Sequence, residues 1–92
     1  MDTNVFHYCL EVEESKNITL AAKHLFISQP ALSKQLNKLE KELGFQLFDR
    51  TRSPITVTPQ GEIFLEFAHR YVDMERELLE SLRQFSPVQT EP

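Results

Sequence analysis

Residues 29–41 hold a set of side chains that can form hydrogen bonds with the bases and phosphates of nucleic acids. If the segment is helical, its leucines recur at spacings of four, three and four residues and form one buried stripe: Leu32, Leu36, Leu39 and Leu43. The opposite face then carries Pro30, Lys34, Asn37, Lys38 and Lys41, with Gln29 and Ser33 at the flank nearer the N-terminus. Glutamine, serine, asparagine and lysine can bond the edges of bases, and lysine also neutralises phosphate. A helix with this pattern has the chemistry needed to read double-stranded DNA.

The N-terminal half of such a helix usually enters the major groove, so four residues are expected nearest the bases: Gln29, Pro30, Ser33 and Lys34. Lys38 and Lys41 are expected to meet phosphates or solvent. A second interpretation stays open on these residues alone. A lysine-bearing solvated face is common on surface helices, and Glu40 and Glu42 could simply pair with neighbours.

A short helix is predicted just before this segment, over residues 20–26, with Thr19 as its cap. Ala21 and Ala22 leave little bulk on it, so another helix can approach closely. The expected packing side chains of this helix are Leu25 and Phe26.

The connection between the two helices has clear stop and start signals. After a turn at Ile27, Ser28 is expected to cap the helix over residues 29–43. Pro30 is tolerated in its first turn, where N–H groups lack intrahelical partners, and Gly44 ends the helix. A short helix, a tight turn and a longer helix form the layout of a helix-turn-helix.

A further helix is predicted at the start of the chain, capped by Asp2 or Thr3 and ending near Ser15. Its apolar residues are Val5, Phe6, Tyr8, Cys9 and Val12. Positions 5, 8, 9 and 12 follow helical spacing and predict a buried face.

Residues 45–58 change to an alternating pattern that favours two short strands. The apolar members of the alternation are Phe45, Leu47, Ile55 and Val57. Arg52, Ser53 and Pro54 form the polar connection of this hairpin, and Arg52 at its tip is expected to meet DNA. Arg50 has two interpretations, as a DNA contact or as a structural residue paired with Asp49 or Glu42.

A long helix is predicted from Pro59 to about Phe85, because Thr58-Pro59 is a strong start signal and only Gly61, in the first turn, interrupts the pattern. Its roughly 40 Å would be too long for a compact domain of this size. Its apolar stripe consists of Phe64, Phe67, Ala68, Tyr71, Met74, Leu78, Leu82 and Phe85. The first half is expected to pack on the helix-turn-helix and the distal half on a second copy of the chain. The alternative is that the last turns fray and pairing needs another domain.

The 92 residues allow one small domain, and their net charge of −4 at first argues against a polyanionic partner. The distribution reverses this argument. Residues 16–60 carry seven bases against three acids, whereas residues 1–15 carry four acids and no base, and residues 61–92 carry seven acids against three bases. A basic centre can bind a polyanion while the acidic flanks point away.

Catalysis and metal binding are not expected. His7 and Cys9 lie about 200° apart on a helix and cannot easily share a ligand, and no carboxylate, histidine and nucleophile set emerges from the sequence. Cys9 falls on the apolar face and is expected in the core; as a single cysteine it implies a reducing compartment. With no signal-like start and no membrane-length apolar run, a cytoplasmic protein without membrane contact is expected.

A protein-interaction module is the other class considered. Amphipathic helices also bind proteins, but such a face more often carries aromatic or aliphatic anchors. The face from Gln29 to Lys41 has none.

The sequence resembles the LysR-type bacterial transcription regulators in three runs that occur in register. The first runs from Thr19 to Leu36 and contains Ala21-Ala22 and Ser28-Gln29-Pro30-Ala31-Leu32-Ser33. The second runs from Leu39 to Arg50 and contains Leu39-Glu40-Lys41-Glu42-Leu43-Gly44 and Leu47-Phe48-Asp49-Arg50. The third is Thr58-Pro59-Gln60-Gly61. Together the resemblance covers roughly residues 3–85.

The resemblance implies a mainly α fold: a winged helix-turn-helix (three helices plus a short two-stranded wing) over residues 1–58, a linker helix over 59–86 and a polar tail over 87–92. It implies a major-groove helix, phosphate contacts from Ser28 and Lys38, and a wing arginine at the minor groove. It also implies a homodimer through the linker helix on two operator half-sites, with a tetramer open for the full-length protein. A small-molecule inducer would bind a separate C-terminal domain, so no cofactor is expected in this chain.

Two residues depart from the pattern. Many members carry arginine where this chain has Ser53, so the minor-groove contact would fall to Arg52. Many also carry arginine where Lys34 stands, and lysine cannot form the bidentate fork on guanine. Base preference at that position is expected to be looser.

Overall fold

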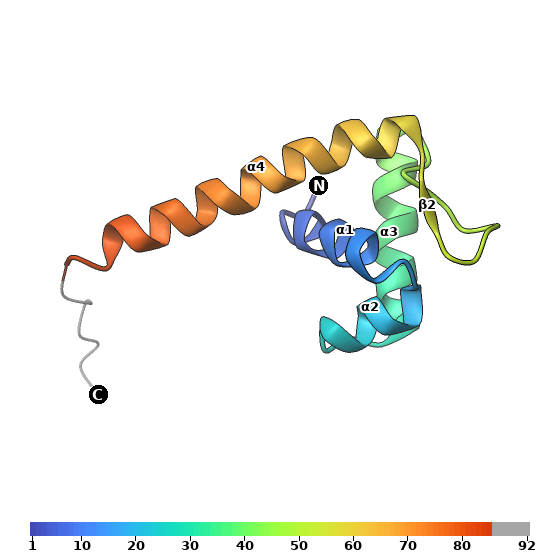
Figure 1. The fold of residues 1–92 in the computed structure, drawn as a ribbon, viewed down its shortest axis with the longest axis horizontal. Coiled ribbons are helices and arrows are strands. Elements are labelled where there is room, and N and C mark those ends of the chain that lie inside the picture. Colours follow the sequence, from blue (N-terminus) through green and yellow to red (C-terminus); the bar gives the residue numbers. More distant parts are fainter. Residues whose placement is uncertain (86–92) are drawn as a thin grey trace.

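A computed structural model of the chain describes residues 1–85. The elements are, in order, α1 (Asn4–Ser15), α2 (Ile18–His24), α3 (Gln29–Leu43), β1 (Phe48–Asp49), β2 (Thr56–Val57) and α4 (Pro59–Leu82). Figure 1 shows α1, α2 and α3 gathered beneath the first half of α4, with the hairpin projecting on one side and the end of α4 extending on the other. The predicted winged helix-turn-helix followed by a long helix is confirmed.

The second helix begins earlier than predicted. Asn17, rather than Thr19, is its cap, and the Asn17 side chain accepts a hydrogen bond from the Leu20 backbone N–H at 2.8 Å. Asparagine caps at least as well as threonine, and using Asn17 places Ile18 at the first helical position. The predicted range of 20–26 was therefore wrong by two residues at each end.

Phe26 was predicted to pack against the core, but it lies in the turn between α2 and α3 and points into solvent. Its φ is 59°, and its side chain is 95% exposed instead of packed. The left-handed conformation lets the Ile27 N–H return to the Ala22 carbonyl at 3.0 Å, which closes the helix end. Leu25 and Ile27, on either side, are the residues that pack against the core.

Both ends of α3 follow the prediction. The Ser28 hydroxyl accepts from the Ala31 N–H at 3.2 Å, and Pro30 lies in the first turn. Gly44 closes the helix with a φ of 82°, where a residue with a side chain would be strained.

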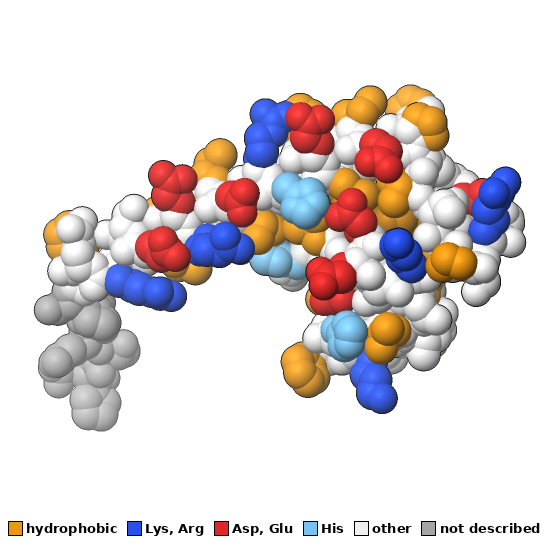
Figure 2. All heavy atoms as spheres, in the orientation of Figure 1, with side chains coloured by type: hydrophobic (Ala, Val, Ile, Leu, Met, Phe, Trp, Pro, Cys, Tyr) orange, Lys and Arg blue, Asp and Glu red, His pale blue; other side chains and the backbone are white. Residues whose placement is uncertain are grey.

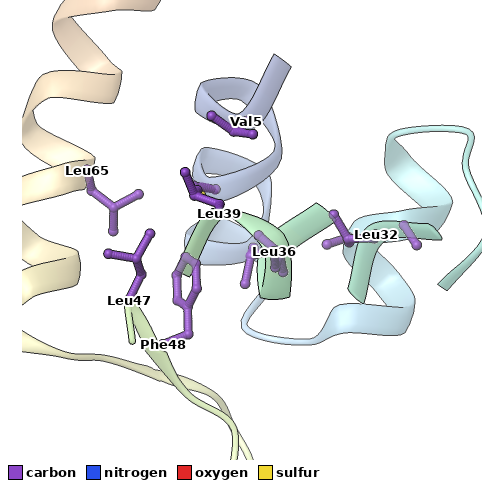
Figure 3. Close-up of a cluster of buried hydrophobic side chains, with 11 residues drawn as sticks. Val5, Leu32, Leu36, Leu39, Leu47, Phe48 and Leu65 are labelled. Carbon is purple, nitrogen blue, oxygen red and sulfur yellow. The ribbon is translucent and has the colours of Figure 1, made fainter. Parts of the chain in front are cut away.

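The core collects side chains from every helix and from the residues entering the hairpin. Its members are Val5, Cys9, Val12, Ala21, Ala22, Leu32, Leu36, Leu39, Leu47, Phe48 and Leu65. In Figure 3, Leu47 and Leu65 point toward one another where the hairpin meets α4. Leu43, predicted to be buried with the other leucines, is 38% exposed because it faces an open apolar hollow between α3 and the start of α4.

The wing begins later and is shorter than predicted. β1 and β2 pair antiparallel, with Phe48 opposite Val57 and Asp49 opposite Thr56. Phe45 and Leu47 lie before β1, where Leu47 is buried and Phe45 is exposed. Their alternation thus reflects burial of one side of the chain and not strand pairing.

The long helix starts as predicted and ends at Leu82, three residues sooner. The Thr58 hydroxyl accepts from the Gly61 N–H at 2.9 Å. Gly61 is required by packing, since a Cβ there would lie 2.0 Å from the Leu47 carbonyl oxygen. The predicted tail over 87–92 lies outside the described residues. Across those that are described, no helix combines the length and hydropathy needed to cross a bilayer.

Candidate nucleic-acid interface

The face of α3 that points away from the core is polar over its whole length. Its exposed residues are Gln29, Pro30, Lys34, Asn37, Lys38 and Lys41. Ser33 is half-buried, and its hydroxyl oxygen accepts from Gln29 Nε2 at 3.0 Å. The structure therefore brings the predicted DNA-facing residues of α3 onto one surface and joins two of them by a hydrogen bond.

The N-terminus of α3 is open to solvent beside this surface. Ser28 is exposed, and its side-chain oxygen is used by the Ala31 N–H while the hydroxyl hydrogen can still be donated. The free backbone N–H groups of a first turn carry a partial positive charge that favours an anion. The predicted phosphate contact of Ser28 is thus chemically possible from this position.

Arg50 has a structural partner that the sequence did not indicate. Its Nη2 donates to Glu40 Oε1 at 2.9 Å, so the pairing expected with Asp49 or Glu42 was wrong. Glu40 is only 8% exposed, and its other oxygen accepts from the backbone N–H groups of Leu47 (2.6 Å) and Phe48 (3.3 Å). One signal could have revealed Glu40, because on a helix it lies about 40° from Leu36, at the edge of the buried stripe.

The end of the wing presents one exposed cation. The Arg52 side chain is 73% exposed, and its Nε lies 3.6 Å from Asp49 Oδ2. Hydrogen bonds from the Thr51 side chain and backbone, followed by the charge of Arg52, hold the pKa of Asp49 below its usual value. Ser53 and Pro54, the other predicted wing contacts, are exposed beside Arg52.

Acidic side chains lie along α4, interspersed with basic ones, while a basic side chain marks the end of the wing (Figure 2). The acids on the N-terminal and C-terminal flanks are partly engaged with histidines. His7 Nε2 lies 2.9 Å from Glu75, and His69 Nε2 lies 3.1 Å from Glu13, so both pairs join α1 to α4. The acidic flanks thus meet each other at the α1–α4 contact, away from the polar face of α3.

The apolar stripe of α4 divides into two parts. Phe64 and Tyr71 stack on Phe6 of α1, with ring centroids 5.5 and 4.5 Å away. Ala68 is fully buried in the same contact and leaves the predicted dimer surface, because α1 of the same chain already covers it. The exposed remainder of the predicted set is Phe67, Met74, Leu78, Leu82 and Phe85, to which the structure adds Ile63 and Leu79.

A wide apolar hollow lies beside the start of this exposed stripe. It has a volume of about 500 Å³ and is lined by Met1, Phe6, Leu43, Phe45, Leu47, Gln60, Ile63, Phe64 and Phe67. We call it the α1–α4 groove. Leu43 and Phe45, two large apolar residues that remain exposed, lie on its wall.

Cys9 belongs to the core, as predicted. It is fully buried, and burial, followed by the nearby charge of Glu40, raises the pKa of its thiol to about 12. Within residues 1–85, no group of histidine, cysteine and carboxylate side chains is placed to hold a metal ion.

Comparisons with known proteins agree with this geometry. Residues 3–62 match the family described as bacterial regulatory helix-turn-helix protein, lysR family. YcgK of Bacillus subtilis, an uncharacterized HTH-type transcriptional regulator, is 41% identical over 86 residues, covering 94% of this chain and 26% of YcgK. The HTH-type transcriptional regulator BenM of Acinetobacter baylyi is 33% identical over 89 residues, covering 97% of this chain and 29% of BenM.

Solved structures share the fold at comparable identity. The BenM DNA-binding domain in complex with benA site 1 DNA has a TM-score of 0.87 and 33% identity, covering 91% of this chain and 94% of that chain. Vibrio fischeri DarR in complex with DNA has a TM-score of 0.84 and 27% identity, covering 91% of this chain and 29% of that chain.

The fold and the polar face of α3 define a winged helix-turn-helix DNA-binding domain. The chain belongs to the lysR family of bacterial regulatory helix-turn-helix proteins. It spans about a quarter of the length of the curated relatives that it matches.

Proposed function

We propose that this chain is the DNA-binding and dimerising part of a transcription regulator that binds operator DNA sequence-specifically as a homodimer. The observation that carries the proposal is the exposed polar face of α3, which begins at a capped helix N-terminus and lies opposite a buried leucine stripe. The similarity to a BenM domain bound to DNA supports the same use of this face.

In this proposal the N-terminal half of α3 lies in the major groove. Gln29 and Ser33, joined by their hydrogen bond, present an amide and a hydroxyl to base edges, and Pro30 and Lys34 lie beside them. Asn37 and Lys38, one turn further along, face the DNA backbone, where Lys38 neutralises a phosphate. Ser28 contacts a phosphate at the N-terminus of the helix.

The wing is assigned to the adjacent minor groove. Arg52 is the cation that reaches it, because it is exposed at the end of the wing and Asp49, its nearest acid, is a weak exposed partner. Ser53 and Pro54 would line the same contact. Arg50 keeps four N–H donors beyond the one given to Glu40 and can meet a phosphate at the base of the wing.

The dimer is assigned to the exposed apolar surface of α4 and to the α1–α4 groove. The groove lies at the start of α4, whereas Leu78 and Leu82 lie near its end, about 25 Å away along the helix. A two-fold axis between these regions sets the distal stripe of one protomer against the groove of its partner. Both apolar surfaces are then covered at once, which a single chain cannot achieve.

The remaining assignments concern the whole regulator. The chain itself would carry out no catalysis and bind no cofactor, and a small-molecule inducer would act through sequence outside these 92 residues. The regulator would work in the cytoplasm on the nucleoid, and its full-length form could assemble further, into a tetramer. These assignments are carried over from the resemblance to LysR-type regulators, and the family match supports only that resemblance.

The test is a selection of bound sequences from random duplex DNA at fixed salt, using this chain. An enriched dyad with half-sites about one helical turn apart supports sequence-specific dimeric binding. Enrichment of single half-sites would keep the DNA assignment and remove the dimer. Salt-sensitive binding without enrichment would reduce the function to nonspecific DNA binding, and no binding at all would favour a protein partner.

A further inference from the structure

The wing is too short to set its own direction. β1 and β2 have two residues each and pair at two register positions. A two-stranded hairpin on its own is marginally stable at best. The direction in which residues 50–55 project must therefore come from contacts between the base of the wing and the rest of the domain.

Two backbone hydrogen bonds hold the base of the wing, one to the turn after α1 and one within the hairpin. The Ile55 N–H donates to the Lys16 carbonyl at 3.1 Å, in the turn between α1 and α2. The Thr58 N–H donates to the Leu47 carbonyl at 3.0 Å, across the base of the hairpin itself. Neither bond reaches α3, the helix that must act together with the wing on DNA.

Glu40 makes the polar link to α3, beside the apolar packing of Leu47 and Phe48 in the core. One carboxylate oxygen accepts from the Leu47 and Phe48 N–H groups, and the other accepts from Arg50, at the start of the loop. Burying a charge is costly unless the charge is paired and hydrogen-bonded, and here both oxygens have donors. In the part of the chain that the structure describes, these are the side-chain hydrogen bonds that join α3 to the wing.

Glu40 cannot serve DNA binding by contact. It is buried, and a carboxylate would repel phosphate. Any effect of this residue on operator affinity must therefore act through the groups that it holds.

We propose that Glu40 is a positioning residue that fixes the wing relative to α3, so that the helix and the wing engage one half-site together. The proposal rests on the assignment of α3 to the major groove and of Arg52 to the minor groove. Without the Glu40 carboxylate, the wing samples several directions and Arg52 loses its fixed place.

A double-mutant cycle on the chain tests this coupling. Glu40→Gln removes the charge with almost no change in shape, and Arg52→Ala removes the wing contact. Each is expected to lower operator affinity about tenfold, the usual scale for a charge-assisted hydrogen bond. The double variant is expected to bind the operator almost as well as Arg52→Ala alone. Once Arg52 is gone, fixing the direction of the wing no longer contributes to affinity. Additive losses, or no loss from either single variant while the unchanged chain still binds, would overturn the proposal.

The matched control is Glu42→Gln. Glu42 lies two residues along the same helix, is exposed, and meets only the N-terminal amine of Met1, at 3.7 Å, among the described residues. Glu42→Gln changes the net charge by the same amount as Glu40→Gln. It is expected to leave operator affinity nearly unchanged, with or without Arg52→Ala. Glu40→Asp keeps the charge but withdraws the carboxylate by about 1.5 Å, and replaces Glu40→Gln in the cycle if that variant does not fold.

A measurement without DNA separates this proposal from the proposed function. Spin labels at Lys41→Cys and Ser53→Cys report the distance between α3 and the wing, while the buried Cys9 thiol, with its raised pKa, stays unlabelled. A narrow distance distribution is expected, with marked broadening in Glu40→Gln and none in Glu42→Gln. An equally narrow distribution in folded Glu40→Gln would overturn the positioning role even if operator binding is intact. If the unchanged chain itself fails to bind DNA, the proposed function is overturned, whatever the distance distribution shows.

Discussion

The two long helices, α3 and α4, are both amphipathic, but their exposed faces differ in chemistry. Each buries one face in the common core, with Leu36 and Leu39 from α3 and Leu65 and Ala68 from α4. The face that remains exposed is polar and basic on α3, whereas on the distal part of α4 it is apolar. The comparison teaches that the buried faces fix the fold and the exposed faces indicate the partner: a polyanion for α3 and a second apolar surface for α4.

The largest expected effect is on the shared core. Leu65→Ala removes a fully buried side chain that packs on Leu47, and should lower the free energy of unfolding by about 3 kcal/mol. Denaturant unfolding at several protein concentrations measures this loss. The adjacent and exposed Glu66→Ala should change the free energy by less than about 0.5 kcal/mol. Equal losses for the two variants would show that this face of α4 is not packed as described.

The second largest effect is expected on dimerisation, which is assigned to the exposed stripe of α4 and not to α3. Leu78→Glu places a charge on the exposed apolar stripe without touching the core, so the domain should stay folded but become a monomer. Operator affinity is expected to fall about a hundredfold, or roughly 2.7 kcal/mol, because two half-sites are no longer bound together. Sedimentation and operator titration check both results. Glu80→Gln, on the opposite side of the helix, is the control, and a dimer that survives Leu78→Glu would end the assignment of this stripe.

Specificity should depend on the exposed face of α3. Ser33→Ala is expected to weaken operator binding about tenfold while leaving binding to random DNA nearly unchanged, since base contacts are worth roughly 1–3 kcal/mol. Gln29→Ala should behave similarly, and the double variant should lose less than the product of the two, because Gln29 and Ser33 are hydrogen-bonded. Equal losses on operator and random DNA would remove Ser33 from the base-reading set.

The smallest effect should come from one lysine on the same face. Lys38→Gln is expected to weaken binding to operator and random DNA alike and to reduce the slope of log affinity against log salt by about one. Titrations over a range of salt concentrations measure the slope. Arg76→Gln removes a charge from α4 next to Asp73 and should leave the slope unchanged. A slope that is the same for Lys38→Gln and the unchanged chain would place Lys38 in solvent.

Most of the fold could be predicted because its signals are local. Leucine spacing, the Ser28 and Thr58 caps, the glycine at the end of α3 and the proline at the start of α4 act within a few residues of where they stand. The misplaced start of α2 shows the limit of such signals, since Asn17 and Thr19 are both good caps and only packing chooses between them.

The sequence by itself determined the helical order, the winged helix-turn-helix and the polar face of α3, because periodicity and capping depend on neighbours in the chain. Tertiary structure decided the contacts between residues that are distant in the sequence. The burial of Glu40 under Arg50 and the β1 backbone joins residues up to ten positions apart. The exposure of Phe26 and Leu43 and the covering of Ala68 by α1 likewise depend on which elements meet. In the sequence, an apolar or charged side chain looks the same whether its partner lies in the same chain or in another molecule. Only the packed structure shows which of the two partners it has.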